Sequence, residues 1–188
     1  RELKKPVEAE SVFKDGLGIK GGAENAQLRK GLLECLFDQK KWKQVIPEAE
    51  KLAGQPGAVG VRASYQGGIA RFEQGDFKEA AQVLEVLKGK VKGNEDYEQT
   101  TLYMLAESRR ELKEFDAAVA AYEAAADLKT RKEVTADALY RLGRVRFDSL
   151  KEYPQAAEAF GKFTRDFKGH KLAVDAGVYL GRSQLEAG

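Results

Sequence analysis

Cysteine and histidine are nearly absent from this chain of 188 residues, which contains one of each. The single cysteine, Cys35, cannot form an internal disulfide, and one cysteine with one histidine cannot supply a zinc site of the usual kind. Cys35 lies in an apolar helical stretch, so we interpret it as a small buried residue and not as a reactive thiol. The histidine, His170, follows Lys168 and Gly169 in a turn-like segment and is expected to be solvent-exposed.

The chain also lacks long apolar runs and a surplus of charge of either sign. No stretch of about 18 consecutive apolar residues occurs, so no membrane-spanning helix is predicted. Lysine and arginine number 32 and aspartate and glutamate number 30, which leaves a formal net charge of +2. Because nucleic acids and acidic membranes attract concentrated positive charge, this balance argues against nucleic acid as a partner.

Catalytic groupings of residues are missing as well. Acidic residues are plentiful, but they recur with a repeat instead of converging, and no nucleophile, histidine pair or phosphate-binding loop accompanies them. We therefore expect neither an enzyme nor a bound cofactor. A role as the regulatory arm of an enzyme stays open.

What the chain does contain is an internal repeat. An aromatic residue recurs at intervals of 35, 38 and 38 residues, at Trp42, Phe77, Phe115 and Tyr153. A small residue follows each aromatic residue three positions later, and an acidic residue stands just before each short polar gap that precedes it. Units of this length cannot bury their apolar faces alone, so neighbouring units are expected to stack and share one core.

Each unit has the pattern of two antiparallel helices joined by a short turn. In the turn before Phe77, Gly75 is expected to adopt the left-handed conformation that ends the first helix, and Asp76 is a natural N-cap for the second. The turn before Tyr153, at residues 149–152, is one residue longer than the others.

These signals predict an all-α chain, a right-handed α-solenoid of helix-turn-helix repeats. Residues 1–22 are expected to form a leader, made of a helix from a preceding repeat and a glycine-rich connection. The array is expected over residues 23–188, with repeats at about 23–57, 58–94, 95–132 and 133–170 and a partial repeat at 171–188.

The repeat resembles the tetratricopeptide repeat. The pairs Leu142-Gly143 and Leu180-Gly181 match the leucine-glycine pair of that family, and the segment 74–81 is similar to its helix-to-helix turn. The resemblance covers about residues 23 to 188. It implies a non-catalytic scaffold for protein–protein interaction, in which the first helices of the repeats line a concave face and the second helices form the outside.

The junction from Phe160 to Asp175 resembles a narrower group within this family. Its sequence is similar to junctions in bacterial cell-envelope repeat proteins, namely the periplasmic Tol-Pal-associated coordinator and the outer-membrane assembly lipoproteins. Those proteins usually carry a proline where this chain has Lys168. The resemblance implies a location in the bacterial periplasm or cell envelope, with the cytoplasm as the alternative.

Candidate partner-binding residues follow from the family resemblance. Tyr65, Tyr103 and Tyr140 each lie three residues before the small residue of a first helix, where the family commonly presents a ligand-facing side chain. One and two turns further along the first helices, the candidate residues of the concave face are Ile69, Phe72, Glu107, Arg110, Arg144, Phe147 and Arg182. Tyrosine and arginine bring large area with a polar group, so the groove is expected to bind an extended peptide or a helix of a partner protein.

Two alternatives to this interpretation stay open. Tyrosine is also common at this place in the family for packing alone. In addition, the stretch from Leu172 to Leu185 has more apolar residues than one neighbouring helix can cover, so the array could associate with a second copy of itself.

Overall fold

The computed structural model describes residues 6–22 and 25–188, and every regular element in those ranges is a helix. The α-helices are α1 (Pro6–Gly18), α2 (Ala26–Asp38), α3 (Trp42–Ala53), α4 (Gly57–Gln74), α5 (Phe77–Lys90), α6 (Glu98–Glu111), α7 (Phe115–Leu128), α8 (Lys132–Arg144), α9 (Tyr153–Asp166) and α10 (Ala173–Ala187). A π-helix, η1 (Val145–Leu150), continues α8. The prediction of an all-α chain is confirmed, and the second helices begin at the four repeated aromatic residues.

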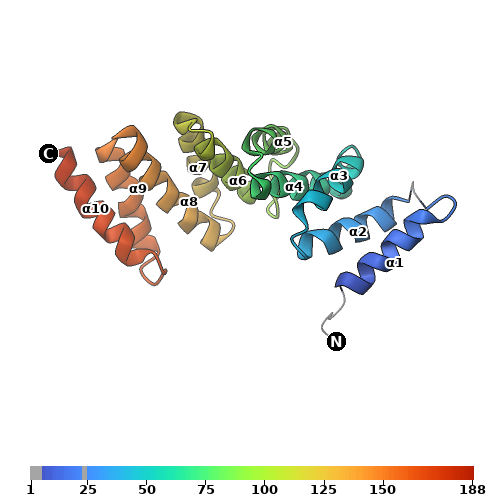
Figure 1. The fold of residues 1–188 in the computed structure, drawn as a ribbon. Helices are drawn as coiled ribbons and strands as arrows, with labels where there is room; N and C mark the ends of the chain where they lie inside the picture. Colours follow the sequence, from blue (N-terminus) through green and yellow to red (C-terminus); the bar gives the residue numbers. More distant parts are fainter. Residues whose placement is uncertain (1–5, 23–24) are drawn as a thin grey trace. The chain divides into compact units, whose positions relative to one another are not determined.

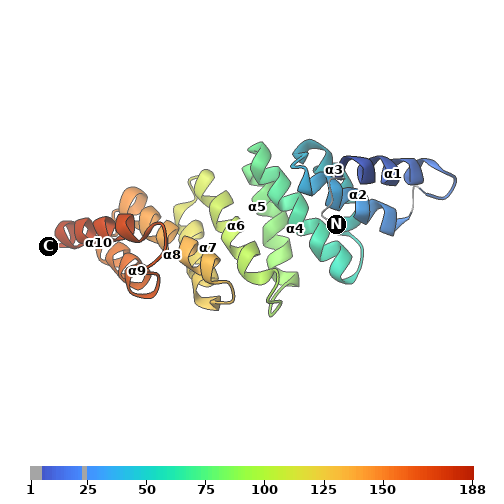
Figure 2. The ribbon, with the colours of Figure 1, turned by 90° about the horizontal axis from the view of Figure 1, so that it is seen from below.

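The chain forms two compact units, Arg1–Val91 and Lys92–Gly188. Within each unit, successive helices pack as antiparallel hairpins, which is the arrangement of an α-solenoid (Figures 1 and 2). The first unit contains α1 to α5 and the second contains α6 to α10. Each unit is described by itself below.

The core of the first unit lies where α2, α3 and α4 meet. Its buried residues are Leu32, Leu33, Leu36, Val45, Ala49, Leu52, Ala63 and Ala70. Helix α1 packs on α2, and there the ring of Phe13 lies against Gly31 so closely that a Cβ atom on this glycine would come within 2.3 Å of the ring. The absent side chain of Gly31 therefore makes room for the aromatic residue that joins α1 to the core.

A buried carboxylate also joins α1 to the rest of the first unit. Glu10 of α1 forms ion pairs with Lys14 and Lys41, both at 2.6 Å, and accepts a hydrogen bond from Gln39 at 2.9 Å. These contacts lower the pKa of Glu10 from its ordinary value of 4.5 to about 2, with the bond from Lys14 as the largest cause and the bond from Lys41 next. Since Gln39 and Lys41 lie in the turn between α2 and α3, Glu10 holds α1 to that turn.

The second unit has its own core, whose largest fully buried side chains include Tyr122, Phe160, Phe163 and Leu105. At one end of it, the buried side chain of Gln99 holds three helices together. Its amide nitrogen donates to the carbonyl of Ala125 at 2.8 Å and to the hydroxyl of Thr135 at 2.9 Å. Its oxygen accepts from the hydroxyl of Thr130 at 2.8 Å and from the backbone of Arg131 at 2.6 Å. All four hydrogen-bonding positions of this amide are thus used.

The turns between the first and second helices share one backbone geometry. The residue two positions before the repeated aromatic residue has a positive φ in each turn, which is 54° at Lys40, 84° at Gly75, 62° at Lys113 and 60° at Lys151. The next backbone N–H bonds back to a carbonyl in the last turn of the first helix, as in the 2.9 Å bond from Asp76 to Arg71. This is a Schellman ending, and the left-handed conformation predicted at Gly75 is confirmed.

The extra residue in the turn before Tyr153 is taken up by the π-helix η1. The returning hydrogen bond runs from Glu152 to Arg146 at 2.9 Å, one residue further back than in the other three turns. A π-helix accommodates one added residue without breaking the helix. The ring of Phe147 still contacts the ring of Tyr153 edge to face at 5.3 Å, the same centroid distance as for Phe72 and Phe77.

Two local predictions are wrong. Asp76 precedes the second helix as expected, but its side chain makes no capping hydrogen bond, because its backbone (φ −81°, ψ 60°) departs from the extended conformation of a capping residue. His170 is mostly buried, not solvent-exposed. Its Nδ1 accepts a hydrogen bond from the backbone of Leu172 at 3.2 Å, its Nε2 lies 3.3 Å from the carboxylate of Glu133, and its ring meets Phe163 edge to face.

Candidate partner-binding surface

The predicted partner-binding residues all lie on first helices of the repeats. Tyr65, Ile69 and Phe72 are on α4 of the first unit, and the others are on α6, α8, η1 and α10 of the second. The two sets belong to different units, so each is described within its own unit.

In the first unit, the three predicted residues of α4 are half-buried and follow one face of the helix. Phe72 packs edge to face on Phe77, the first residue of the second helix, at 5.3 Å. One turn before Tyr65 on α4, the guanidinium of Arg62 forms an ion pair at 3.1 Å with Glu34 of α2. The first helices of this unit therefore offer partly exposed apolar side chains beside a pair of opposite charges.

In the second unit, Glu107 lies at the centre of a buried polar cluster. It is 6 % exposed and accepts hydrogen bonds from the hydroxyl of Tyr122 and from Arg110, the latter at 3.0 Å. A second guanidinium, that of Arg141 on α8, lies 3.5 Å from the same carboxylate. Two cations and a hydroxyl compensate the burial of this charge, so Glu107 is not a free base for catalysis.

The tyrosines around Glu107 are held in their neutral form. Burial, together with the negative charge of Glu107, raises the pKa of Tyr103 to about 12 and raises that of Tyr122 as well. The two rings meet edge to face at 6.0 Å. Tyr103 is half-buried, whereas Tyr122 is fully buried. The ring of Tyr103 on α6 is thus partly exposed, and it packs on the fully buried ring of Tyr122.

The residues predicted on α8, Tyr140 and Arg144, meet the next first helix, α10. Tyr140 is only 7 % exposed, and its hydroxyl donates to the carboxylate of Asp175 on α10. The guanidinium of Arg144 donates to the same hydroxyl at 3.3 Å and to Asp148 at 2.6 Å. Burial, reinforced by Asp175, raises the pKa of Tyr140. Tyr140 therefore acts here by packing and by positioning Arg144, not by presenting its ring to solvent.

Two arginines lie over one aromatic ring at this place. The guanidinium carbon of Arg144 is 4.5 Å from the ring centroid of Tyr179, and that of Arg182 is 5.5 Å from the same centroid. Arg182 also lies over Phe147 at 5.0 Å, and Phe160 stacks on Tyr179 from the core at 5.3 Å. Stacking of this kind attracts the cation and fixes the plane of its donors.

We call the group of Tyr140, Arg144, Phe147, Tyr179 and Arg182 the arginine–aromatic surface. Arg182 is exposed and forms no ion pair with any residue that the structure describes, and the side chain of Arg144 is 38 % exposed. The donors of both guanidiniums can therefore reach a carboxylate from outside. Planar guanidinium groups bind carboxylates through paired hydrogen bonds.

Sequence reasoning missed several members of these clusters. Tyr179 is the most important of them, because the guanidiniums of Arg144 and Arg182 both lie over its ring. The spacing that selects Tyr140 selects Val178 in α10, one residue away, and Val178 is 55 % exposed. Arg141 and Asp175 were also missed. Their role depends on contacts between helices of different repeats, which spacing within one repeat does not show.

Other kinds of site find no support in the described residues. In the ranges 6–22 and 25–188, no group of three or more histidine, cysteine, aspartate or glutamate side chains is placed to hold a metal ion. None of the helices described has the length and apolar character needed to cross a membrane. Cys35 is half-buried, and burial, followed by the charge of Asp38, raises the pKa of its thiol.

Comparison with known proteins agrees with the architecture. The family model of the tetratricopeptide repeat matches residues 103–162. No curated protein matches the sequence. Among solved structures, MamA (41-end) from Desulfovibrio magneticus RS-1 is similar with a TM-score of 0.72, at 17% identity over 88% of each chain.

Two further solved structures show the same likeness. The nearly identical TPR-like repeats of a putative kinesin light chain from Podosopora anserina give a TM-score of 0.67, at 11% identity over 90% of this chain and 89% of that one. Another MamA structure gives 0.58, at 21% identity over 95% and 92%. Identities this low show the fold alone. Residues 103–162 thus match the tetratricopeptide repeat family, and the chain as a whole has a fold of the tetratricopeptide type.

Proposed function

We propose that this chain is a non-catalytic scaffold for protein–protein interaction, whose first helices bind an extended peptide or a helix of a partner protein. The observation that carries the proposal is the arginine–aromatic surface, where two partly exposed guanidiniums lie over the ring of Tyr179. Large rings and arginines are the side chains that most often dominate the binding energy of an interface. The fold supports the proposal, since arrays of this type leave the first helices open to a ligand.

The charges of the same region argue against catalysis. Glu107 is neutralised by Arg110 and Arg141, Asp175 accepts the hydroxyl of Tyr140, and Asp148 is paired with Arg144. A general base needs a carboxylate or imidazole that is free to take a proton from a substrate. Here the acids hold side chains in place, and the groups left open are donors and rings, which suit recognition.

The location that we propose is the bacterial cell envelope. Its support is the sequence of the junction from Phe160 to Asp175, which is similar to junctions in envelope proteins of this family. Fractionation of the source cells, followed by detection with an antibody against this chain, tests the location. Recovery in the cytoplasmic fraction alone would contradict it.

The test of partner binding compares two double variants of the second unit. Peptides that bind the chain are first selected from a displayed random library, and their affinities are then measured by calorimetry. Arg144→Ala with Arg182→Ala removes both guanidiniums. Because a hydrogen bond to a charged group contributes about 1.5–3 kcal/mol, we expect the affinity to fall by about tenfold or more.

The matched control is Lys162→Ala with Arg165→Ala, which removes the same charge from the second helix α9 of the same unit. It should keep the affinity of the unmodified chain. Circular dichroism of both variants verifies that the helices are intact. If the selected peptides bind the two double variants equally well, the arginine–aromatic surface is not the binding site.

Self-association is a second candidate function, and one observation favours it. Val174, Val178 and Leu185 follow one face of α10 and are 82 %, 55 % and 83 % exposed. Exposed apolar stripes of this kind often mark an interface. Light scattering after gel filtration should show a dimer or larger species that Val178→Glu with Leu185→Glu dissociates. Val86→Glu, at a single exposed valine of α5, serves as the control. A monomer at all concentrations would eliminate this candidate.

A further inference from the structure

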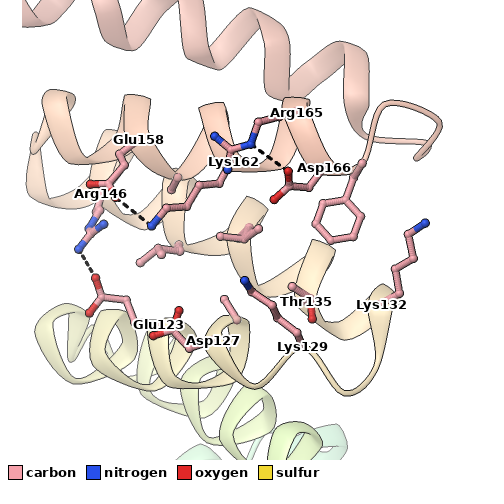
Figure 3. Close-up of a pocket in the computed structure, with 15 residues that line it drawn as sticks. Glu123, Asp127, Lys129, Lys132, Thr135, Arg146, Glu158, Lys162, Arg165 and Asp166 are labelled. Atoms are coloured by element: carbon pink, nitrogen blue, oxygen red, sulfur yellow. Dashed lines mark hydrogen bonds and ion pairs between the residues drawn. The ribbon is translucent and has the colours of Figure 1, made fainter.

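A second concave site lies on the second helices, away from the arginine–aromatic surface. It is a half-open cavity of about 750 Å³ in the second unit, between α7 and α9, with α8 and η1 behind it (Figure 3). Ligand pockets commonly have volumes of about 300–1,000 Å³. Nothing in the proposed binding of a partner by the first helices uses this cavity.

The floor of the cavity is apolar. The side chains that form it are Ala126, Leu139, Leu142, Ala159 and Phe167. The hydroxyl of Thr135, which also lines the cavity, already accepts from Gln99 at 2.9 Å and donates to the carbonyl of Arg131 at 3.2 Å. An extended peptide backbone would therefore find few hydrogen-bonding partners on this floor, whereas a hydrocarbon chain requires none.

One end of the cavity is closed by charged side chains that form ion pairs with each other. Arg146 pairs with Glu123 of α7 and lies 3.6 Å from Glu152, and Lys162 pairs with Glu158 at 2.8 Å (Figure 3). Arg146 crosses from η1 to α7 at this end. A helix of a partner could not continue past this crossing, but a chain that ends in a methyl group fits a closed end.

The other end of the cavity carries unpaired positive charge. Asp166 is held by Arg165 at 3.0 Å, but Lys129 and Lys132 form no ion pair with any described residue. Figure 3 shows Lys132 at the end opposite Arg146 and Glu123, and Lys129 between that end and Asp127, with its ammonium group turned towards the middle of the cavity. Asp127 is the one acid of the lining that lacks such a partner among the described residues.

A neighbouring cavity extends this positive region. It has a volume of about 450 Å³, shares Lys132, Asp166 and Phe167 with the first, and adds Lys168 and Lys171 to the lining. Neither added lysine is paired within the described part of the chain, whereas Glu133 lies 3.3 Å from the ring of His170. Lysines from two connections, α7 to α8 and α9 to α10, thus surround the open end of an apolar cavity.

We propose that this cavity binds a free fatty acid, with the acyl chain on the apolar floor and the carboxylate at Lys129 and Lys132. Three features carry the assignment: a floor with few free hydrogen-bonding groups, one end closed by paired charges, and unpaired lysines at the other end. The apolar chain contributes affinity by leaving water, and the ammonium groups select an anion at its end.

The experiment uses the full chain with labelled alanine and leucine methyl groups, observed by nuclear magnetic resonance. Octanoate, decanoate and dodecanoate are added below the concentrations at which they form micelles. We expect contacts between the ligand chain and the methyl groups of Leu139 and Leu142. Each buried methylene should tighten binding by about fourfold, and dodecyltrimethylammonium, which has the same chain and the opposite charge, should not bind.

The variant Lys129→Glu with Lys132→Glu should weaken dodecanoate binding by about tenfold or more, since it reverses the charge beside the carboxylate. Lys78→Glu with Lys90→Glu makes the same change on exposed residues of α5 and should have no effect. Equal binding of the cationic amphiphile, contacts confined to the exposed face of α10, or no binding by any of the three carboxylates would overturn the proposal.

Two other probes distinguish a fatty acid from larger anionic partners. Vesicles of phosphatidylglycerol present the anionic headgroup without a free acyl carboxylate, and a helical peptide rich in glutamate and leucine presents acidic side chains. Dodecanoate should bind in the presence of either. If only the peptide, or only the vesicle, shifts the methyl signals of Leu139 and Leu142, the ligand is not a fatty acid.

Discussion

Four lysines of the described residues have the positive φ that favours glycine, and three of them lie in the turns between first and second helices. Lys40, Lys113 and Lys151 have positive φ at the same place in their turns, where Gly75 stands in the remaining turn. For a residue with a side chain, the left-handed conformation is higher in free energy than the right-handed one, because its Cβ approaches the carbonyl oxygen. The turns therefore form because the helices on each side require them, and three of them form at a local cost.

Lys113→Gly is expected to stabilise the second unit by about 0.5–1 kcal/mol, because glycine adopts the left-handed conformation without strain. Gly75→Lys should destabilise the first unit by about 1 kcal/mol or more for the converse reason. Denaturation by urea measures both changes. As a control, Lys78→Gly lies inside α5 and should be destabilising. A loss of stability in Lys113→Gly would mean that its side chain contributes contacts that outweigh the strain.

Glu10 should make the attachment of α1 depend on pH. Its pKa in the folded chain, about 2, is lower than its ordinary value of 4.5. Its contribution to stability is therefore fully present above about pH 4.5 and is lost as the pH falls towards 2. We expect Glu10→Gln to be less stable than the unmodified chain at pH 7 and the difference to shrink between pH 4.5 and 2.

Chemical denaturation of the two proteins across this range, followed by the fluorescence of Trp42 beside Lys41, measures the difference. The exposed residue Glu79 of α5 supplies the control, since Glu79→Gln should change stability little at any of these pH values. A gap between Glu10→Gln and the unmodified chain that stays constant from pH 7 to pH 2 would show that the carboxylate does not hold α1.

At the scale of the helix, η1 shows how the array accepts a change of length. The added residue lies in the last turn of the first helix, and the contact of Phe147 with Tyr153 keeps the geometry of Phe72 with Phe77. The packing between helices is thus kept, and the backbone hydrogen bonds adjust.

Deletion of Ser149 should convert η1 into α-helix and restore the residue spacing of the other turns. Ser149 is exposed, so no core contact is lost. We expect a change in the free energy of unfolding of less than about 1 kcal/mol, since surface changes of this kind are usually small. Thermal unfolding followed by circular dichroism measures it. Deletion of Leu139, which shifts the buried face of α8, should prevent folding of the second unit and serves as the comparison.

The starts of the second helices could be predicted because each begins at a large aromatic residue followed by small ones, a signal contained within a few residues. Arg144, Phe147 and Arg182 could likewise be placed together, because the first two lie one turn apart on one first helix and the repeat spacing puts Arg182 on the next first helix. Tyr179 could not, since its position departs by one residue from that spacing. Nor could Gln99, whose partners lie 26 to 36 residues away in the chain.

At the scale of the whole chain, the array consists of two compact units, and the boundary between them in the sequence lies between Val91 and Lys92. Each has its own buried residues and its own polar contacts that link successive helices, through Glu10 in the first and through Gln99 and Glu107 in the second. In repeat proteins, stability is approximately a sum over neighbouring repeats. Damage to one helix is therefore expected to spread first to the neighbouring helices of its own unit.

Helix α10 packs chiefly on α9 and leaves Val174, Val178 and Leu185 exposed, so few contacts oppose its local opening. Its backbone amides should exchange hydrogen with solvent faster than those of α9. Arg182 belongs to α10 and Arg144 to α8, so a ligand held by both arginines must keep α10 in place. Binding then slows this exchange, because the ligand binds the chain in which α10 is packed and not the chain in which α10 has opened.

Exchange followed by mass spectrometry measures this for peptides covering residues 173–187, with and without a selected binding peptide. We expect slower exchange in α10 on binding and no slowing in the Arg144→Ala, Arg182→Ala double variant. If exchange in α10 is unchanged at a saturating concentration of the ligand, binding does not require α10 to stay packed, and the prediction is wrong. The protection of this one helix therefore serves as a reporter of occupancy, so that ligands can be ranked by how far they slow its opening, before any of them is identified.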